Sequence, residues 1–155
     1  METIGIIHSP FKSIEDMPIQ PKGAVGIEGT LHINEDYIEG LKDLDGFSHI
    51  YIIYLFHKAN KTSLTVVPFM DTSERGVFAT RSPLRPNHIG LSIVELIKIE
   101  ESIITIRGVD VLDQTPLLDI KPYIANFDSV TQSSSGWMRA NVDEISKKRS
   151  DDRFK

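Results

Sequence analysis

The sequence contains no cysteine among its 155 residues, which excludes disulfide bonds, thiolate metal sites and cysteine nucleophiles. It also lacks any apolar run that approaches the roughly 20 residues needed to cross a bilayer. The N-terminus lacks the basic region and apolar core of a secretory signal. We therefore expect no membrane partner and a cytoplasmic location.

Positive charge is scarce as well, because 17 Lys and Arg residues face 22 Asp and Glu residues and leave a formal net charge of −5. This balance argues against a broadly basic protein that coats nucleic acid, although it leaves binding through a local basic patch open. A hydrophobic content of 40% is ordinary for a globular protein. The length suits one domain with a real core.

Strand patterns outnumber helical ones along the chain. One segment from Asn34 to Gly46 has the apolar spacing of an amphipathic helix, with Asn34 as the expected cap. Segments rich in β-branched residues predict strands, and 49–56 is apolar enough to be a central strand buried on both faces. The other predicted strands are 2–8, 24–33, 64–67, 91–99 and 102–111, the last two joined by a hairpin turn at 100–101.

Strands and helices do not alternate, and no Gly-x-Gly-x-x-Gly follows the first strand, so the doubly wound fold of many methyltransferases is not expected. We predict a mainly β fold with one or few short helices. Residues 129–136 have the composition of a flexible linker. We expect a domain at 1–128 and a linker and tail at 129–155, with Trp137 and Met138 docking the tail on the domain.

The segment 75–92 is the most informative, since it places Arg75, Arg81 and Arg85 among prolines, glycines and small polar residues. Proline fixes φ and glycine frees it, so this composition predicts a shaped loop. Guanidinium groups bind carboxylates and phosphates bidentately, which favours an anion-binding surface. A solvated connecting turn is the alternative.

A second dense block spans 110–123 and contains a tight turn, Asp113-Gln-Thr-Pro116, followed by Asp119 and Lys121 on an extended stretch. Together with 75–92 and the ordered motifs at 4–11, 18–21, 40–49 and 56–58, it resembles the TrmO family over about residues 1–128. Members of this family are tRNA adenine-N6-methyltransferases that use S-adenosylmethionine (SAM). The sequence departs from the family pattern at Gln114, where glycine is usual, and at His88, where proline is usual. Bacterial members also carry an extra C-terminal domain that this sequence lacks, so the resemblance leaves the mode of RNA binding open, more than the binding of SAM.

The resemblance implies a small single-sheet β-barrel that works as a homodimer, with the SAM site near the subunit boundary. It assigns SAM contacts to Pro18, Ile19, Gln20, His57, Lys58, Arg81, Leu91, Asp113, Gln114, Thr115 and Pro116. Arg81 suits the SAM carboxylate and Leu91 the adenine. For a tRNA substrate, the local basic residues Arg75, Arg85 and Lys121 are the expected phosphate contacts.

In this family the methyl acceptor is the N6 nitrogen of threonylcarbamoyl-adenosine next to the tRNA anticodon, a nitrogen that a positioned base would help to deprotonate. The sequence leaves the base open among His49, Tyr51 and Asp113. We expect no metal, because His8, His49, His57 and His88 lack the close i, i+4 spacing of a helical zinc motif. Two alternatives stay open: methylation of a smaller substrate, and a SAM-binding module without catalysis.

Overall fold

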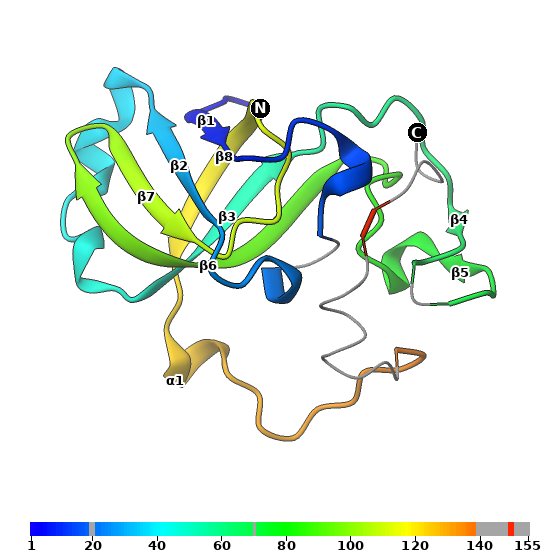
Figure 1. Cartoon of the computed structure of the whole chain (residues 1–155). Coiled ribbons are helices and arrows are strands. Elements are labelled where there is room, and N and C mark those ends of the chain that lie inside the picture. The colour runs from blue at the N-terminus through cyan, green and yellow to red at the C-terminus, as the bar shows by residue number, and fades with distance from the viewer. Residues whose placement is uncertain (19–20, 70, 139–148, 151–155) are drawn as a thin grey trace.

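The fold is a closed antiparallel barrel with a small two-stranded sheet beside it (Figure 1). The computed structural model describes residues 1–18, 21–69, 71–138 and 149–150. The barrel strands are β1 (Gly5–His8), β2 (Glu28–Ile33), β3 (His49–Leu55), β6 (Ile89–Glu100), β7 (Ile103–Arg107) and β8 (Thr115–Pro122). The small sheet pairs β4 (Thr65–Val66) with β5 (Arg75–Gly76). The helical turns are η1 (Ile14–Asp16), η2 (Pro21–Ala24), η3 (Glu35–Leu41), η4 (Leu44–Gly46), η5 (Val77–Ala79) and α1 (Ala125–Asp128).

The barrel strands follow the order β1-β2-β7-β6-β3-β8, and β1 pairs with β8 to close the ring. Closure leaves no free barrel edge, which removes the usual route to edge-to-edge aggregation. The predicted mainly β, single-sheet barrel with few short helices is therefore confirmed.

The core fills the barrel interior and is built by alternation along each strand. In β3, Ile50, Ile52 and Tyr54 point inward and are buried, whereas Tyr51 and Ile53 point outward and are only half-buried. The prediction that 49–56 is buried on both faces is wrong. An antiparallel barrel has one inner and one outer face, so a continuously apolar strand must place half of its side chains outside.

The outer side of β3 and β6 is apolar along three consecutive cross-strand pairs. These pairs are Tyr51 with Ile93, Ile53 with Leu91, and Leu55 with Ile89. We call these six residues the apolar face. Leu91 is 52% exposed and Ile93 is 40% exposed, so the described residues leave this face uncovered at its centre. Apolar groups gathered in this way mark a surface suited to association.

The predicted helix at 34–46 forms two 3₁₀ segments, η3 and η4, in place of one α-helix. Asp43 adopts φ 65, a left-handed conformation that interrupts any continuous helix between them. Asn34 occupies the cap position, but its side chain donates to the Thr3 carbonyl oxygen at 3.0 Å instead of capping. Tyr37 and Leu41 still pack against the core, as the apolar spacing indicated.

Several strand boundaries differ from the predicted ones. The strand expected from residue 24 begins at Glu28, because η2 and Gly26, at φ 81, precede it. The strand expected at 102–111 ends at Arg107, where Gly108 turns the chain with φ 88. The hairpin turn predicted at 100–101 is confirmed, since β6 ends at Glu100 and β7 begins at Ile103. In the described ranges no helix has the length and apolarity to span a membrane.

Candidate functional site

A cavity of about 860 Å³ opens where the end of the barrel meets the 68–85 loop region and the C-terminal segment. The predicted residues Pro18, Arg81, Arg85 and Leu91 all line it. Its walls combine apolar side chains with the arginine guanidinium groups, which is the composition of a small-molecule site. The structure thus brings together residues that are 73 positions apart in sequence.

Arg81 has the most available positive charge in this cavity. Its side chain is exposed, and within the described residues it makes no hydrogen bond or ion pair. Arg85 differs, because its Nη1 donates to the Thr80 carbonyl at 3.1 Å and to the Ser82 carbonyl at 3.2 Å. Arg85 therefore braces the loop, whereas Arg81 is free to bind an anion.

A second cavity of about 80 Å³ adjoins the first and contains three further predicted residues, His57, Lys58 and Thr115. The His57 Nδ1 lies 3.3 Å from the Thr115 hydroxyl. Burial, and then the nearby Lys58, lower the pKa of His57. His57 is therefore neutral at pH 7 and suited to hydrogen bonding rather than to anion binding.

Asp113, Gln114 and Pro116 line neither of these cavities. Asp113 joins the turn before β8 to the N-terminal segment, since its carboxylate accepts from the Ser9 backbone N–H at 3.0 Å and from Lys12. Burial favours a higher pKa, but the hydrogen bonds from Lys12, Ser9 and Gln114 outweigh it and lower the pKa of Asp113 to about 2. A carboxylate with this pKa is a weak base.

This network predicts acid-sensitive stability. Because the folded-state pKa of Asp113 is depressed, its contribution is present above the unfolded pKa near 3.8 and is lost as pH falls through about 2. Urea unfolding measures the free energy of unfolding at pH 5 and at pH 2.5. Between these two pH values, the wild type should lose about 1–2 kcal/mol more of this free energy than Asp113→Asn does. Asp45→Asn, in η4 at the other end of the barrel, is the control. Equal losses in the wild type and Asp113→Asn would contradict the assignment.

The two departures from the family pattern both have left-handed backbones. Gln114 has φ 65, a conformation that glycine adopts without strain. Its side-chain Nε2 lies 2.9 Å from His8 Nδ1, a contact that offsets part of this cost. His88 has φ 51, which a proline ring cannot adopt. Its Nδ1 lies 2.9 Å from the Pro83 carbonyl oxygen, so the histidine helps to hold the conformation of the loop at 75–92, which we call the arginine loop.

The three residues predicted to contact phosphates do not form one patch. Arg75 forms an ion pair with Asp71 at 2.5 Å, and its guanidinium lies 5.5 Å from the centre of the Trp137 ring, which lines the first cavity. Lys121 lies on β8, where its Nζ is 3.5 Å from Asp119 Oδ2, and it lines neither cavity. Arg75 and Arg85 therefore lie by the cavity, whereas Lys121 is on the barrel wall.

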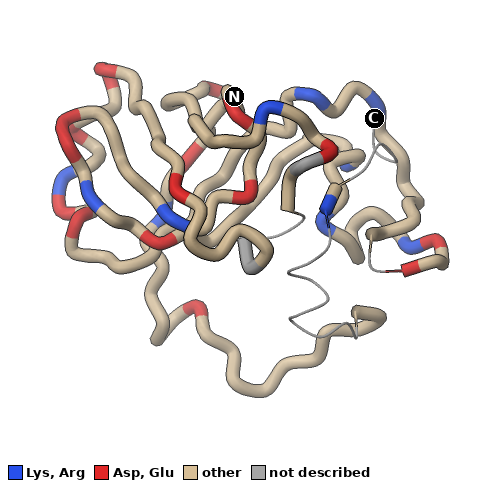
Figure 2. The backbone as a smooth tube through the Cα atoms, viewed as in Figure 1, with Lys and Arg blue, Asp and Glu red and all other residues tan. Residues whose placement is uncertain are grey.

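The charges are nonetheless divided between two halves of the molecule. Figure 2 shows acidic segments dominating the barrel end near η3, η4 and the β6–β7 hairpin. Basic segments gather toward β4, β5 and the loop that lines the large cavity. The acidic residues of the first end include Glu35, Asp36, Glu39, Asp43, Asp45, Glu100 and Glu101. A polyanion would therefore approach from the cavity side.

Sequence reasoning did not select a buried polar chain at the cavity wall, formed by Tyr54, Ser92 and Asp110. The Tyr54 hydroxyl lies 3.0 Å from the Ser92 hydroxyl, which donates to Asp110 Oδ1 at 2.8 Å. Gly90 lies under the Tyr54 ring, because a Cβ at this position would be 2.2 Å from Tyr54 Cε2. The available signal was an aspartate between the apolar residues Val109 and Val111.

The base candidates from the sequence lie elsewhere. His49 is exposed at the start of β3 with its Nδ1 2.9 Å from the Ser48 hydroxyl, and Tyr51 belongs to the apolar face. Neither lines either cavity. Ile19 and Gln20, two further predicted SAM contacts, lie outside the described residues. Among the residues that are described, no group of three or more His, Asp or Glu side chains is arranged to hold a metal ion.

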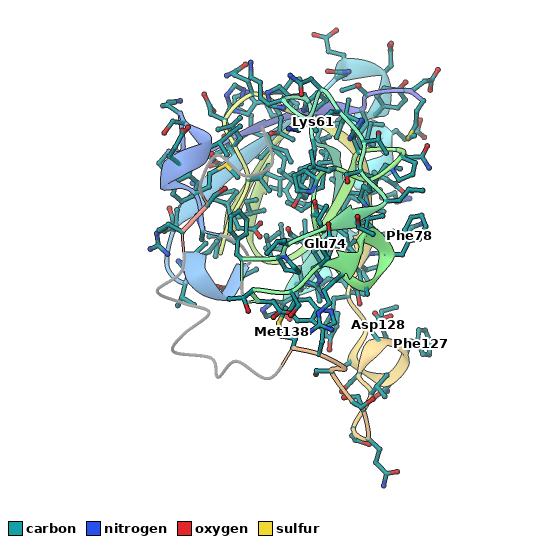
Figure 3. All side chains as sticks on the ribbon, turned by 90° about the vertical axis from the view of Figure 1, so that its right-hand side faces the viewer. Lys61, Glu74, Phe78, Phe127, Asp128 and Met138 are labelled. Carbon is teal, nitrogen blue, oxygen red and sulfur yellow. The ribbon has the colours of Figure 1, made fainter. Side chains whose placement is uncertain are left out.

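The C-terminal segment docks on the body through Trp137, which contacts η5 and β5 beside the barrel. The Trp137 Nε1 donates to the Ala79 carbonyl at 2.8 Å, and both Trp137 and Met138 line the first cavity. Figure 3 shows the Phe78 and Phe127 side chains pointing away from the body of the molecule, and Phe78, which also lines the cavity, is 74% exposed. An exposed aromatic ring at a cavity rim is able to stack on a ligand.

Comparisons with known proteins agree with this architecture. A probable S-adenosyl-L-methionine-binding protein from Pyrococcus abyssi is 52% identical over 151 residues, which cover 97% of this chain and 82% of that protein. A tRNA (adenine(37)-N6)-methyltransferase from Mus musculus is 39% identical over 135 residues, but the match covers only 31% of the mouse protein. The crystal structure of TrmO from Pseudomonas aeruginosa matches with a TM-score of 0.74 and 37% identity, covering 88% of this chain and 60% of that one.

The family model for the tRNA-methyltransferase O N-terminal domain matches residues 6–129, a range that contains all of the barrel strands except Gly5, the first residue of β1. This range also includes the arginine loop and the turn at 113–116. The chain therefore belongs to the tRNA-methyltransferase O N-terminal domain family.

Proposed function

We propose that this protein binds SAM and transfers its methyl group to N6 of threonylcarbamoyl-adenosine next to the anticodon of tRNA, in the cytoplasm. The observation that carries the proposal is the cavity at the barrel end, which joins an apolar wall to the guanidinium of Arg81, a group with no partner among the described residues. Membership in the family and relatives named as SAM-binding proteins and tRNA methyltransferases support it.

The cavity residues suit the parts of SAM. Arg81 matches the carboxylate of the methionine moiety through a charge-assisted bidentate contact. Leu91 and Pro18 offer apolar surface to the adenine. His57 and Thr115, in the adjoining cavity, offer a neutral ring nitrogen and a hydroxyl for hydrogen bonds to the ribose or amine.

The acceptor nitrogen sets the remaining requirements. Conjugation with the carbamoyl group makes its N–H more acidic and withdraws its lone pair, so removal of the proton is needed for efficient attack. The protein must also align the nitrogen, the methyl carbon and the sulfur. Alignment of this kind lowers the activation free energy by several kcal/mol. A site at the junction of two cavities is able to hold both reactants side by side.

We propose that tRNA phosphates are contacted by Arg75 and Arg85 on the basic cavity side and by Lys121 on the barrel wall. Lys121 gives the cleanest test, because it lies outside both cavities. Lys121→Ala should reduce the slope of log affinity for tRNA against log salt by about 0.7–0.9 and leave SAM affinity unchanged. Lys98→Ala is the matched control, since Lys98 also forms an ion pair and is similarly exposed but lies at the acidic end. An unchanged slope in Lys121→Ala, measured by filter binding, would remove Lys121 from the RNA surface.

We also propose a homodimer in which a second copy covers the apolar face. Leu91 and Ile89 belong to this face and also line the large cavity. A partner seated on β3 and β6 would therefore border the cavity and place the SAM site near the subunit boundary. Burial of two or more side chains of this size would contribute several kcal/mol to association.

The experiment that tests the function is a methyl-transfer assay with the purified full chain. Labelled SAM is incubated with tRNA that carries threonylcarbamoyl-adenosine, and with the same tRNA lacking that group, and the nucleosides are analysed by mass spectrometry. A mass increase of one methyl group on the threonylcarbamoyl nucleoside alone is the expected result. SAM binding without transfer to tRNA would favour a smaller substrate or a SAM-binding module.

A further inference from the structure

We propose that Asp110 is the base that takes the proton from the acceptor nitrogen, held in position by Ser92 and Tyr54 at the junction of the two cavities. This inference rests on the proposed methyl transfer to an N–H group. The placement of Asp110 is the first reason. Asp110 lines both the large cavity, with Arg81 and Leu91, and the small one, with His57 and Thr115.

The hydrogen bonds of Asp110 are the second reason. The Ser92 hydroxyl donates to Oδ1 at 2.8 Å, and the Tyr54 hydroxyl, 3.0 Å from Ser92, donates in turn to the Ser92 oxygen. Both hydroxyl protons are thereby committed, which fixes the carboxylate orientation. Among the described side chains, none hydrogen-bonds to Oδ2. The residue is 8% exposed and lines both cavities, and its carboxylate also accepts from its own backbone N–H, so Oδ2 is the oxygen that we assign to a ligand.

The surrounding charges make this carboxylate a suitable base. Burial raises the pKa of Asp110 to about 6, and the hydrogen bonds from Ser92 and from the backbone N–H of Asp110 itself, with the nearby Arg81 charge, offset only part of the burial effect. The other ionisable groups that line the cavities beside it are Tyr54, Arg85, His57 and Lys58. Burial also raises the pKa of Tyr54, so this hydroxyl stays protonated and remains a donor. A base with a pKa near 6 is ionised at pH 7 yet strong enough to take a proton from an acidified N–H.

The step balances without a further reactant. The N6–H bond breaks and its proton forms a bond to Asp110 Oδ2, which leaves the electron pair on nitrogen. That pair forms the N–CH₃ bond as the S–CH₃ bond breaks, and S-adenosylhomocysteine leaves with the sulfur electron pair. The proton on Asp110 then passes to water once the products have left the cavity.

The test compares the wild type with Asp110→Asn in single-turnover methyl transfer to tRNA bearing threonylcarbamoyl-adenosine. The asparagine oxygen still accepts from Ser92, so the local structure is preserved. We expect the rate constant to fall by at least about 100-fold, the range for loss of a general base, while the Kd for SAM changes less than about threefold. In the wild type the rate constant should rise with pH up to about 6 and then level off. The pH profile of the slower reaction that remains in Asp110→Asn should lack this rise.

Ser92→Ala serves as a second variant, because it removes the bond that positions the carboxylate and should lower the rate with little change in Kd. An Asp110→Asn rate constant within threefold of the wild-type value would overturn this inference and leave the proposed function unaffected. Loss of SAM binding in Asp110→Asn would also overturn it, and would place Asp110 in the cofactor site. A wild type that leaves this tRNA unmethylated would overturn the proposed substrate and the inference with it.

Discussion

Replacing Arg81 by alanine should weaken SAM binding by about 1.5–3 kcal/mol, the range for loss of a hydrogen bond to a charged group. This corresponds to an increase in Kd of about 10- to 150-fold. The physical reason is that Arg81 lines the large cavity and has no competing partner among the described residues, so its whole hydrogen-bonding capacity is available to the SAM carboxylate. Isothermal titration calorimetry of the folded variant measures the change directly.

Arg107→Ala is the matched control, because Arg107 is equally cationic but is held by Glu28 and Glu95 on the barrel wall, each at 3.2 Å. Its loss should leave SAM affinity unchanged. Arg81→Lys separates charge from geometry, since an ammonium group keeps the charge and loses the bidentate contact. Unchanged SAM affinity in a folded Arg81→Ala variant would remove Arg81 from the cofactor site.

The second large effect is expected at the apolar face. Ile93→Glu places a charge within the apolar face, the surface proposed to meet the second copy. Desolvating an unpaired carboxylate costs several kcal/mol, so the dimer Kd should increase by at least about 100-fold. Ile93 points outward, with its neighbour Val94 in the core, so the fold itself should tolerate the change. Sedimentation or light scattering should show a shift toward the 17.4 kDa monomer.

Ile103→Glu controls for the general effect of a surface charge. Ile103 is 37% exposed, close to the 40% of Ile93, but it lies at the start of β7 beside the acidic hairpin. It should leave the oligomeric state intact. A wild type that is already monomeric, or an Ile93→Glu variant that dimerises normally, would contradict the proposed interface. SAM titration of both variants then tests whether the second copy borders the cofactor site.

Much of the fold was predictable because strand composition is a local property. The β-branched content of β1, β3, β6 and β7 identified the strands, and the absence of alternating helices excluded the doubly wound fold. The small errors arose from effects beyond local sequence. Whether β3 is buried on one face or two depends on barrel closure, and the 3₁₀ form of η3 and η4 depends on the left-handed turn at Asp43.

The candidate site was predictable only through the family resemblance, which is confirmed. Spacing alone does not reveal that Pro18, Arg81 and Leu91 line one cavity, because three separate elements bring them together. Their roles, with those of the other predicted SAM and phosphate contacts, stay predictions. Asp110 was missed because an aspartate between apolar residues does not by itself indicate that the residue lines a cavity. Its position emerges only when Tyr54 and Ser92 are placed beside it across the barrel.

The position of Trp137 has a practical consequence for spectroscopy. The sequence contains a single tryptophan, and its indole N–H is bonded to the Ala79 carbonyl in the wall of the large cavity. Fluorescence excited at the red edge of indole absorption therefore arises from one place, next to the site where ligands are proposed to bind. The protein thus carries its own optical probe, and ligand entry and departure become measurable in real time without a chemical label.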